Sequence, residues 1–326
     1  MFRSMVVVAL APLWAGCSTL APEDPDLTPM KPTAVRETRI VSTGVKEFAT
    51  FASATVTYTR PKMQRSEYSL NAGSGVLRYP DSDPQVRIDL LDRKIGWRLD
   101  PKGKKAIECP LQGCISQGKR KPATNNLGEQ DKSRDPNCRL KVGNTALKVV
   151  STGAKRNING FDTEQYDIRW LVTLRDNAAR KATGTVSVDL WTAPVTLALD
   201  DAIALDKTYV QAREKILPAS GDATRPGLLP HEVDTLLNGY LAQSVTPADR
   251  ASLLAAISKV DEVKGYPVLI RVKWTVAGTA CSMDDTPYGA GDKPLFVLTW
   301  ELKSYKLVSL HDSLFAPPKG YKVRKG

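Results

Sequence analysis

The feature that most constrains the fold of this chain is a repeated alternation of apolar and polar residues with a period of two. From Val268 to Val276 every even-numbered residue is apolar, and Arg271, Lys273 and Thr275 stand between them. Because successive side chains of a β-strand point to opposite faces of a sheet, this pattern predicts a strand with one buried and one solvated face. Comparable strand patterns occur at 48–58, 86–90, 95–99, 166–174, 186–190 and 296–302.

Helical patterns are confined to one block, at about residues 200–262. Within it, 206–216 is a candidate helix, and Thr246 followed by Pro247 has the sequence of a helix start before an apolar stripe with helical spacing. Strands with one solvated face favour an antiparallel sheet, whose apolar face has to be buried against another layer. We therefore expect a mainly β, α+β fold in which two or three inserted helices cover the sheet.

The N-terminus has the pattern of an exported bacterial lipoprotein. Arg3 precedes an apolar run that is too short to span a membrane, and small residues lead directly to Cys17. This ending resembles the lipobox, although Trp14 stands where that family usually has leucine, and Ser18 resembles the outer-membrane sorting pattern. We expect residues 1–16 to be a signal peptide and Cys17 to carry the lipid anchor, which would place the chain on the outer membrane facing the periplasm.

The lipidated cysteine is followed by a segment with the composition of a linker. Residues 17–36 contain four prolines and three acidic residues, a composition that cannot bury a core. We expect 17–36 to be a flexible tether and 37–326 to be the folded domain.

Four further cysteines predict disulfides, because the expected compartment oxidises thiols. They allow three pairings. A Cys114–Cys138 bond is favoured because these two residues bracket one polar loop, and it would leave Cys109 to pair with Cys281.

A set of short segments carries a resemblance to a known family. They are the hairpin at 86–104 with its Leu-Asp-Pro ending, the Pro-Leu after Cys109, the Gly-aromatic-x-x-x-x-Tyr pattern at 160–166, the strand end at 189–194, and the Phe-x-x-Pro-x-Gly-Tyr pattern at 315–321. In this order they resemble the LolA/LolB-like family of periplasmic half-barrel lipoproteins. The resemblance implies an unclosed antiparallel half-barrel with a helical lid and an apolar cavity between them. The polar segment 116–137 and the long helical block depart from the family.

Within such a fold, large apolar residues on the strands and in the lid are the candidates for lining a cavity. They are Trp97, Trp170, Trp274 and Trp300 on the strands and Leu236, Tyr240, Leu253 and Ile257 in the lid. A bound acyl chain would be stabilised by about 0.8 kcal/mol per buried methylene. The same stripes are also typical of a core filled by side chains.

Two functions follow from these expectations. The first is a membrane-anchored envelope binding module that holds an acyl chain, a lipid or a lipoprotein in an apolar cavity. The alternative is a structural or stress-sensing envelope lipoprotein that binds a protein partner and has no internal ligand. The sequence leaves the oligomeric state open.

Signatures of catalysis and of metal binding are absent from the sequence. No Gly-x-Ser-x-Gly, P-loop, His-Glu-x-x-His or Gly-x-Gly-x-x-Gly pattern occurs, and the histidines, His231 and His311, lie far apart. The adjacent carboxylates at 200–201 and 284–285 lack EF-hand spacing. We therefore expect no enzyme, no cofactor and no metal. The net charge of +11 would favour anionic headgroups, but no base-reading motif points to nucleic acid.

Overall fold

The computed structural model describes residues 26–44, 50–72, 85–112, 141–217, 263–280, 294 and 296–326. Strands make up 66% of this structure and helices 12%, so the fold is mainly β, as predicted. The strands are β1 (Met30–Gly44), β2 (Phe51–Arg60), β3 (Met63–Ala72), β4 (Gln85–Leu90), β5 (Ile95–Asp100), β6 (Lys105–Pro110), β7 (Lys141–Ile158), β8 (Phe161–Arg175), β9 (Lys181–Ala193), β10 (Tyr266–Gly278), β11 (Phe296–His311) and β12 (Lys322–Lys325). The described helices are α1 (Leu197–Ile216) and a short 3-10 helix, η1 (Asp312–Phe315).

The twelve strands form one sheet in the order β12-β6-β5-β4-β3-β2-β1-β11-β10-β9-β8-β7. One antiparallel meander runs outward from β1 to β6, and a second runs from β7 at the opposite edge back to β11. The two meanders join where β11 pairs with β1, from Met30↔His311 to Gly44↔Phe296. Strand β12 pairs in parallel with β6, which makes the sheet mixed.

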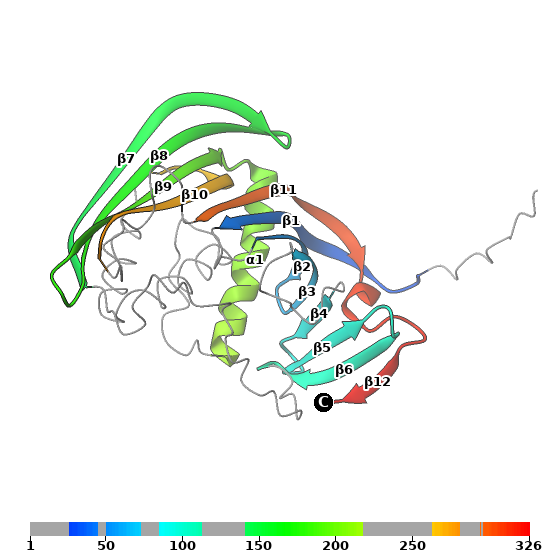
Figure 1. Ribbon diagram of the computed structural model, residues 1–326. Helices are drawn as coiled ribbons and strands as arrows, with labels where there is room; N and C mark the ends of the chain where they lie inside the picture. The colour runs from blue at the N-terminus through cyan, green and yellow to red at the C-terminus, as the bar shows by residue number, and fades with distance from the viewer. Residues whose placement is uncertain are drawn as a thin grey trace, which may run out of the picture.

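The sheet is curved and unclosed. Figure 1 shows its two ends bending towards the same side while the edge strands β7 and β12 remain apart, and it shows α1 on the inner side of the curve. The side of the sheet that holds α1 is called the inner face below, and the opposite side is the outer face. The half-barrel architecture expected from the sequence is confirmed in this form.

Helix α1 begins at a capping residue and has favourable charges at both ends. The hydroxyl of Thr196 accepts a hydrogen bond from the backbone N–H of Leu199 at 3.4 Å, which satisfies one of the donors that a helix start leaves free. Asp200 lies in the first turn and Arg213 in the last, as the helix dipole favours. The helix predicted at 206–216 is therefore present and begins earlier, at Leu197. The rest of the predicted block, to residue 262, lies outside the described residues.

The strands predicted from alternation are all present where the structure describes them. The sequence analysis also missed β1, β3, β6, β7 and β12. Strand β7 shows why, because its side chains are mostly exposed along its whole length and carry little apolar periodicity. Strand β7 is held in the sheet by its backbone pairing with β8, which is interrupted by two register shifts. Such irregularities and the lysines of β7 are devices that protect an edge strand from further pairing.

The predicted tether at 17–36 is wrong at its C-terminal end. Residues from Met30 onward belong to β1, which is paired with β11, and Ala34 is buried at the junction with β2. The strand tolerates Pro32 because this residue lies near its start, before the pairing with β2 begins. A high proline content therefore concealed the first seven residues of a central strand.

The outer face is covered in two places. At the tip of the β7–β8 hairpin, the amide of Asn159 donates to the carboxylate of Glu301 at 2.9 Å and to the carbonyl of Leu302 at 2.8 Å, both in β11. The guanidinium of Arg156 lies 4.0 Å from the ring centre of Trp191. The hairpin tip therefore bends over the outer side of β9 and β11.

The second cover is η1. The guanidinium of Arg60, which is almost fully buried, pairs with the carboxylate of Asp312 and donates to the carbonyl of Leu310 at 2.6 Å. It also lies 4.6 Å from the ring centre of Phe315. These contacts hold Phe315 against the outer sides of β4 to β6, where it completes a separate apolar cluster.

Candidate functional site on the inner face of the sheet

Contacts with α1 and the strand register together decide which side chains lie on the inner face. The hydroxyl of Tyr305 in β11 donates to the carboxylate of Asp206 in α1 at 2.6 Å, so Tyr305 points inwards. Tyr305 lies opposite Arg36 of β1, and alternation along β1 places Ile40 on the same face. Trp300 pairs with Ile40 and therefore also faces inwards.

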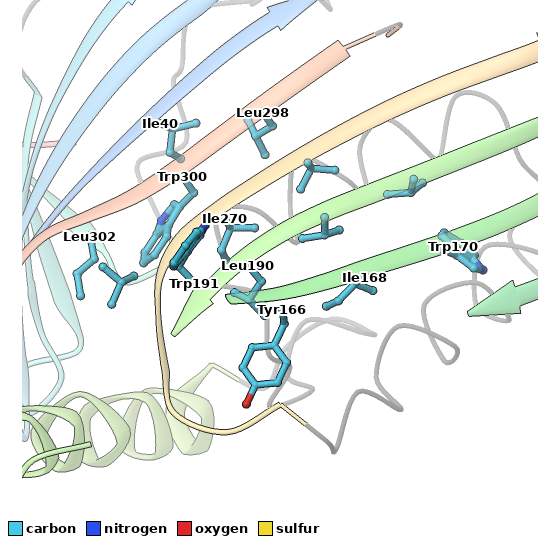
Figure 2. Packing of buried hydrophobic residues seen from close by; sticks show 14 of the residues in the cluster. Ile40, Tyr166, Ile168, Trp170, Leu190, Trp191, Ile270, Leu298, Trp300 and Leu302 are labelled. Carbon is cyan, nitrogen blue, oxygen red and sulfur yellow. The ribbon is translucent and has the colours of Figure 1, made fainter. Parts of the chain in front are cut away.

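Three rows of apolar side chains cross the inner face from β8 towards β1. Direct pairing aligns the first row as Tyr166, Leu190, Ile270, Trp300 and Ile40. The second row is Ile168, Val188, Val272 and Leu298, and the third is Trp170, Val186 and Trp274. Figure 2 shows most of these side chains projecting from neighbouring strands into one apolar cluster. The inner face of β8 to β11 is thus continuously apolar and buried.

Three of the four tryptophans predicted to line a cavity are brought together on this face. Trp170, Trp274 and Trp300 all belong to the same buried cluster, with exposed fractions of 2%, 4% and 0%. The indole N–H groups of Trp170 and Trp300 are buried, and neither has an acceptor within hydrogen-bond distance among the residues that the structure describes. The N–H of Trp191, whose ring lies under Arg156, shares this property. An unpaired buried donor costs about 1–3 kcal/mol, so an acceptor that reached Trp170 or Trp300 would be bound favourably.

The fourth tryptophan, Trp97, lies apart from this cluster, and its side chain points to the outer face. Trp97 pairs with Ile88, whose neighbour in β4, Asp89, accepts a hydrogen bond from Tyr209 of α1 at 3.3 Å. Because neighbours in a strand point to opposite faces, Asp89 faces inwards whereas Ile88 and Trp97 face outwards. Trp97 packs instead in the cluster that Phe315 completes. Alternation in the sequence identified a buried face but could not say on which side of the sheet it lies.

Two buried tyrosines fix α1 to the inner face. Burial, reinforced by the neighbouring carboxylate of Asp206, raises the pKa of Tyr305 far above its usual value. Burial and the neighbouring carboxylate of Asp89 likewise raise the pKa of Tyr209. Both phenols are therefore protonated donors at neutral pH. The guanidinium of Arg36, 3.9 Å from Asp206, supplies the compensating positive charge.

The remaining cavity candidates fall outside the described residues. These are the predicted lid residues Leu236, Tyr240, Leu253 and Ile257. Cys17, the predicted lipidation site, and the predicted signal peptide also lie outside them. Their roles therefore stay predictions.

The disulfide prediction can be followed at one cysteine. Cys109 lies in β6, is buried, and has its Sγ 3.6 Å from the carbonyl oxygen of Ile107. Cys114, Cys138 and Cys281 lie outside the described residues, so the pairing stays a prediction.

Neither a metal cluster nor a membrane-spanning helix is found in the part of the chain that the structure describes. No group of three or more histidine, cysteine or acidic residues there has the geometry to hold a metal ion. None of the helices within the described ranges combines the length and apolar character needed to cross a bilayer. The Nδ1 atom of His311 lies 2.7 Å from the carbonyl of Thr28, whereas His231 lies outside the described residues.

Some residues that shape the inner face were missed by the sequence analysis. Asp206 and Tyr209 lie on the helix predicted at 206–216, whereas Tyr305 lies beyond the strand predicted at 296–302. Nothing in the sequence indicates that these residues meet. A register shift in β11, between the partners of Glu37 and Thr38, turns Tyr305 to the face that Leu302 also occupies. Continued alternation from 296–302 would have placed the odd-numbered Tyr305 on the outer face, so the sequence carried no signal for its inward position.

Comparisons of the chain with models of protein families, with curated proteins and with solved structures each find no match.

Proposed function

We propose that this protein is a binding module of the bacterial envelope that holds an acyl chain, a lipid or the lipid part of a lipoprotein against the inner face of its curved sheet. The observation that carries the proposal is the continuous apolar surface formed by the three rows on β8 to β11. These side chains are buried in one cluster, so a hydrocarbon chain would have to insert beside them, where each buried methylene would contribute about 0.8 kcal/mol.

The tryptophans favour an acyl group over a plain hydrocarbon. The buried indole N–H groups of Trp170 and Trp300 have no acceptor in the described part of the chain, and an ester or amide carbonyl would supply one. The ligand expected from this chemistry has a long apolar chain joined to at least one carbonyl group.

The proposed cellular location rests on the sequence alone. Signal peptide, lipidated Cys17 and outer-membrane sorting would hold the sheet in the periplasm, close to lipids. Incorporation of radiolabelled palmitate into the chain expressed in bacteria tests this address, with Cys17→Ser as the control. Absence of label from the unaltered chain would refute the anchor without bearing on the inner face. The relationship to the LolA/LolB-like family is likewise part of the proposal.

Native mass spectrometry of the detergent-extracted full chain, after exchange with bacterial lipids, tests ligand binding. We expect an additional mass that corresponds to an acyl lipid. Trp300→Phe and Trp170→Phe keep an aromatic ring but remove the indole N–H, and they should reduce the occupied fraction. Trp97→Phe, on the outer face, is the matched control and should leave it unchanged.

The same experiment separates the proposal from a filled core. If no lipid adds mass, or if Trp97→Phe reduces occupancy as much as Trp300→Phe, the inner face is not a ligand site. Urea unfolding of each variant shows whether a loss of occupancy merely follows a loss of stability.

The alternative, a structural or stress-sensing lipoprotein that binds a protein partner, is favoured by one other observation. Leu171 of β8 and Val150 of β7 are exposed on the outer face, at fractions of 47% and 39%, beside the edge of the sheet. Exposed apolar side chains near a strand edge suit a contact with another protein. Cross-linking in cells tests this alternative. It would be favoured if a charged substitution at Leu171 abolished a cross-linked product that the unaltered chain forms, and if neither chain bound lipid.

A further inference from the structure

A groove with both polar and apolar lining residues lies on the inner face of β3 to β6, away from the apolar rows. Its volume is about 300 Å³, and its lining includes Ser66, Tyr68, Gln85, Arg87, Arg98 and Cys109. Register places the polar members on one face, because Ser66 pairs with Arg87, which pairs with Arg98. None of the residues that line the groove is acidic.

Two arginines in this groove lie directly opposite each other on neighbouring strands. Arg87 of β4 and Arg98 of β5 are paired in register, and both are exposed. Like charges that face each other across an antiparallel pair are destabilising. The fold therefore keeps two cations facing each other, and of the two only Arg87 has a neighbouring carboxylate, that of Asp89.

The two arginines differ in what they contact. The Nε of Arg87 donates to the carboxylate of Asp89 at 2.7 Å, and its Nη2 donates to the carbonyl of Leu111 at 3.0 Å. Arg87 is thus held in place and its charge is balanced by Asp89. No carboxylate in the described part of the chain lies within 4.0 Å of the Arg98 guanidinium, which leaves its positive charge uncompensated in the groove.

We propose that this groove binds a phosphate group, with Arg98 as its main charged contact and Arg87 as a pre-positioned second one. Guanidinium groups bind phosphate oxygens through paired N–H donors. The hydroxyls of Ser66 and Tyr68 and the amide of Gln85 line the same space and have the chemistry to complete such a shell. A bound phosphate would also remove the repulsion between the two arginines. This site goes beyond the acyl-binding proposal and involves none of its side chains.

The phosphate could belong to a soluble ester or to a phospholipid headgroup, and the test separates these sources. The full chain, in a neutral maltoside detergent, is titrated calorimetrically with glycerol 3-phosphate in one arm and with dihexanoylphosphatidylglycerol in the other. Arg98→Gln removes the uncompensated charge. Arg271→Gln is the matched control, because Arg271 is an exposed arginine in the middle of β10.

We expect Arg98→Gln to weaken binding about tenfold, which corresponds to about 1.4 kcal/mol, and Arg271→Gln to have no effect. An effect in both arms identifies the phosphate ester itself as the ligand, and an effect only with the phospholipid identifies a headgroup. Equal affinity of the two variants in both arms, or absence of binding by the unaltered chain in both, overturns the proposal. Urea unfolding is the control for misfolding. Removing one of two facing cations should not lower the free energy of unfolding, so a loss of affinity at unchanged stability belongs to the binding site. Trp300→Phe should leave glycerol 3-phosphate binding unchanged, which keeps this test independent of the acyl site.

Discussion

Replacing Arg60 with methionine should destabilise the protein far more than replacing Lys31 with methionine, although both residues pair with the same carboxylate, that of Asp312. The side chain of Arg60 is 4% exposed and that of Lys31 is 55% exposed. Arg60 additionally donates to the hydroxyl of Thr33 at 2.8 Å and to the carbonyl of Leu310 at 2.6 Å. Methionine keeps an unbranched apolar stem but removes every donor.

The magnitude follows from what the substitution leaves behind. Removing one partner of a buried ion pair costs about 3–5 kcal/mol, chiefly because the other charge and its hydrogen-bonding neighbours remain buried. The carboxylate of Asp312 is 30% exposed and keeps Lys31 as a partner at 2.8 Å, so the lower end of that range applies. We expect Arg60→Met to lower the free energy of unfolding by about 3 kcal/mol. An exposed pair is worth about 0–1 kcal/mol, and Lys31→Met should cost no more.

Urea unfolding followed by far-ultraviolet circular dichroism measures both values. An unchanged denaturant slope would show that the effect belongs to the folded state. Equal losses for Arg60→Met and Lys31→Met, or a loss below about 1 kcal/mol for Arg60→Met, would refute the reasoning that burial decides the strength of this pair.

Three further predictions test other contacts. Tyr305→Phe should lower the free energy of unfolding by about 2 kcal/mol in urea, because the half-buried carboxylate of Asp206 loses a charge-assisted hydrogen bond; an unchanged stability would mean that this contact does not hold α1. Hydrogen bonds from two hydroxyls and one backbone N–H lower the pKa of Asp26 to about 2 from an ordinary value of 3.8. These contacts therefore stabilise the folded chain above pH 3.8 and lose that effect as the pH falls towards about 2; a carboxyl carbon of Asp26 that titrates in NMR near pH 4 would contradict this. Gly265→Ala should be more destabilising than Gly160→Ala in thermal unfolding: both glycines have positive φ, 92° and 88°, but only at Gly265 would the new Cβ lie 2.6 Å from a backbone carbonyl oxygen. Equal losses of thermal stability would show that the positive φ alone, and not the contact with the carbonyl oxygen, sets the cost of the substitution.

The strands that the sequence predicts are those with one apolar and one polar face. Alternation in 268–276 and 166–174 sets the positions that face the core, and the structure keeps them in β10 and β8. Alternation is a local property that depends only on the period of the strand, so it survives without knowledge of the neighbours. The mainly β class and the position of α1 could be predicted for the same reason.

What the sequence could not supply is the relation between distant segments. Trp97 and Trp300 show equivalent alternation, yet they lie on opposite faces, because only the chain of strand pairings connects their orientations. The facing arginines, Arg87 and Arg98, are also unremarkable in sequence, since each occupies a polar position of its strand. Their approach requires the register of β4 against β5, which no local pattern encodes.

The division of the inner face into an apolar and a polar part has a structural cause in β2. Its inward positions are small hydroxyl residues, of which Ser53, Thr57 and Thr59 are buried. Small side chains on β2 allow α1 to lie close to the sheet, where it contacts β1, β2 and β11. Toward its N-terminal end Ala202 joins the apolar cluster, whereas Tyr209 further along bonds to β4 beside the groove. Because the helix occupies the strip between the two regions, an acyl chain and a phosphate group would contact different side chains. A substitution in one region should therefore leave binding in the other intact, unless it displaces α1.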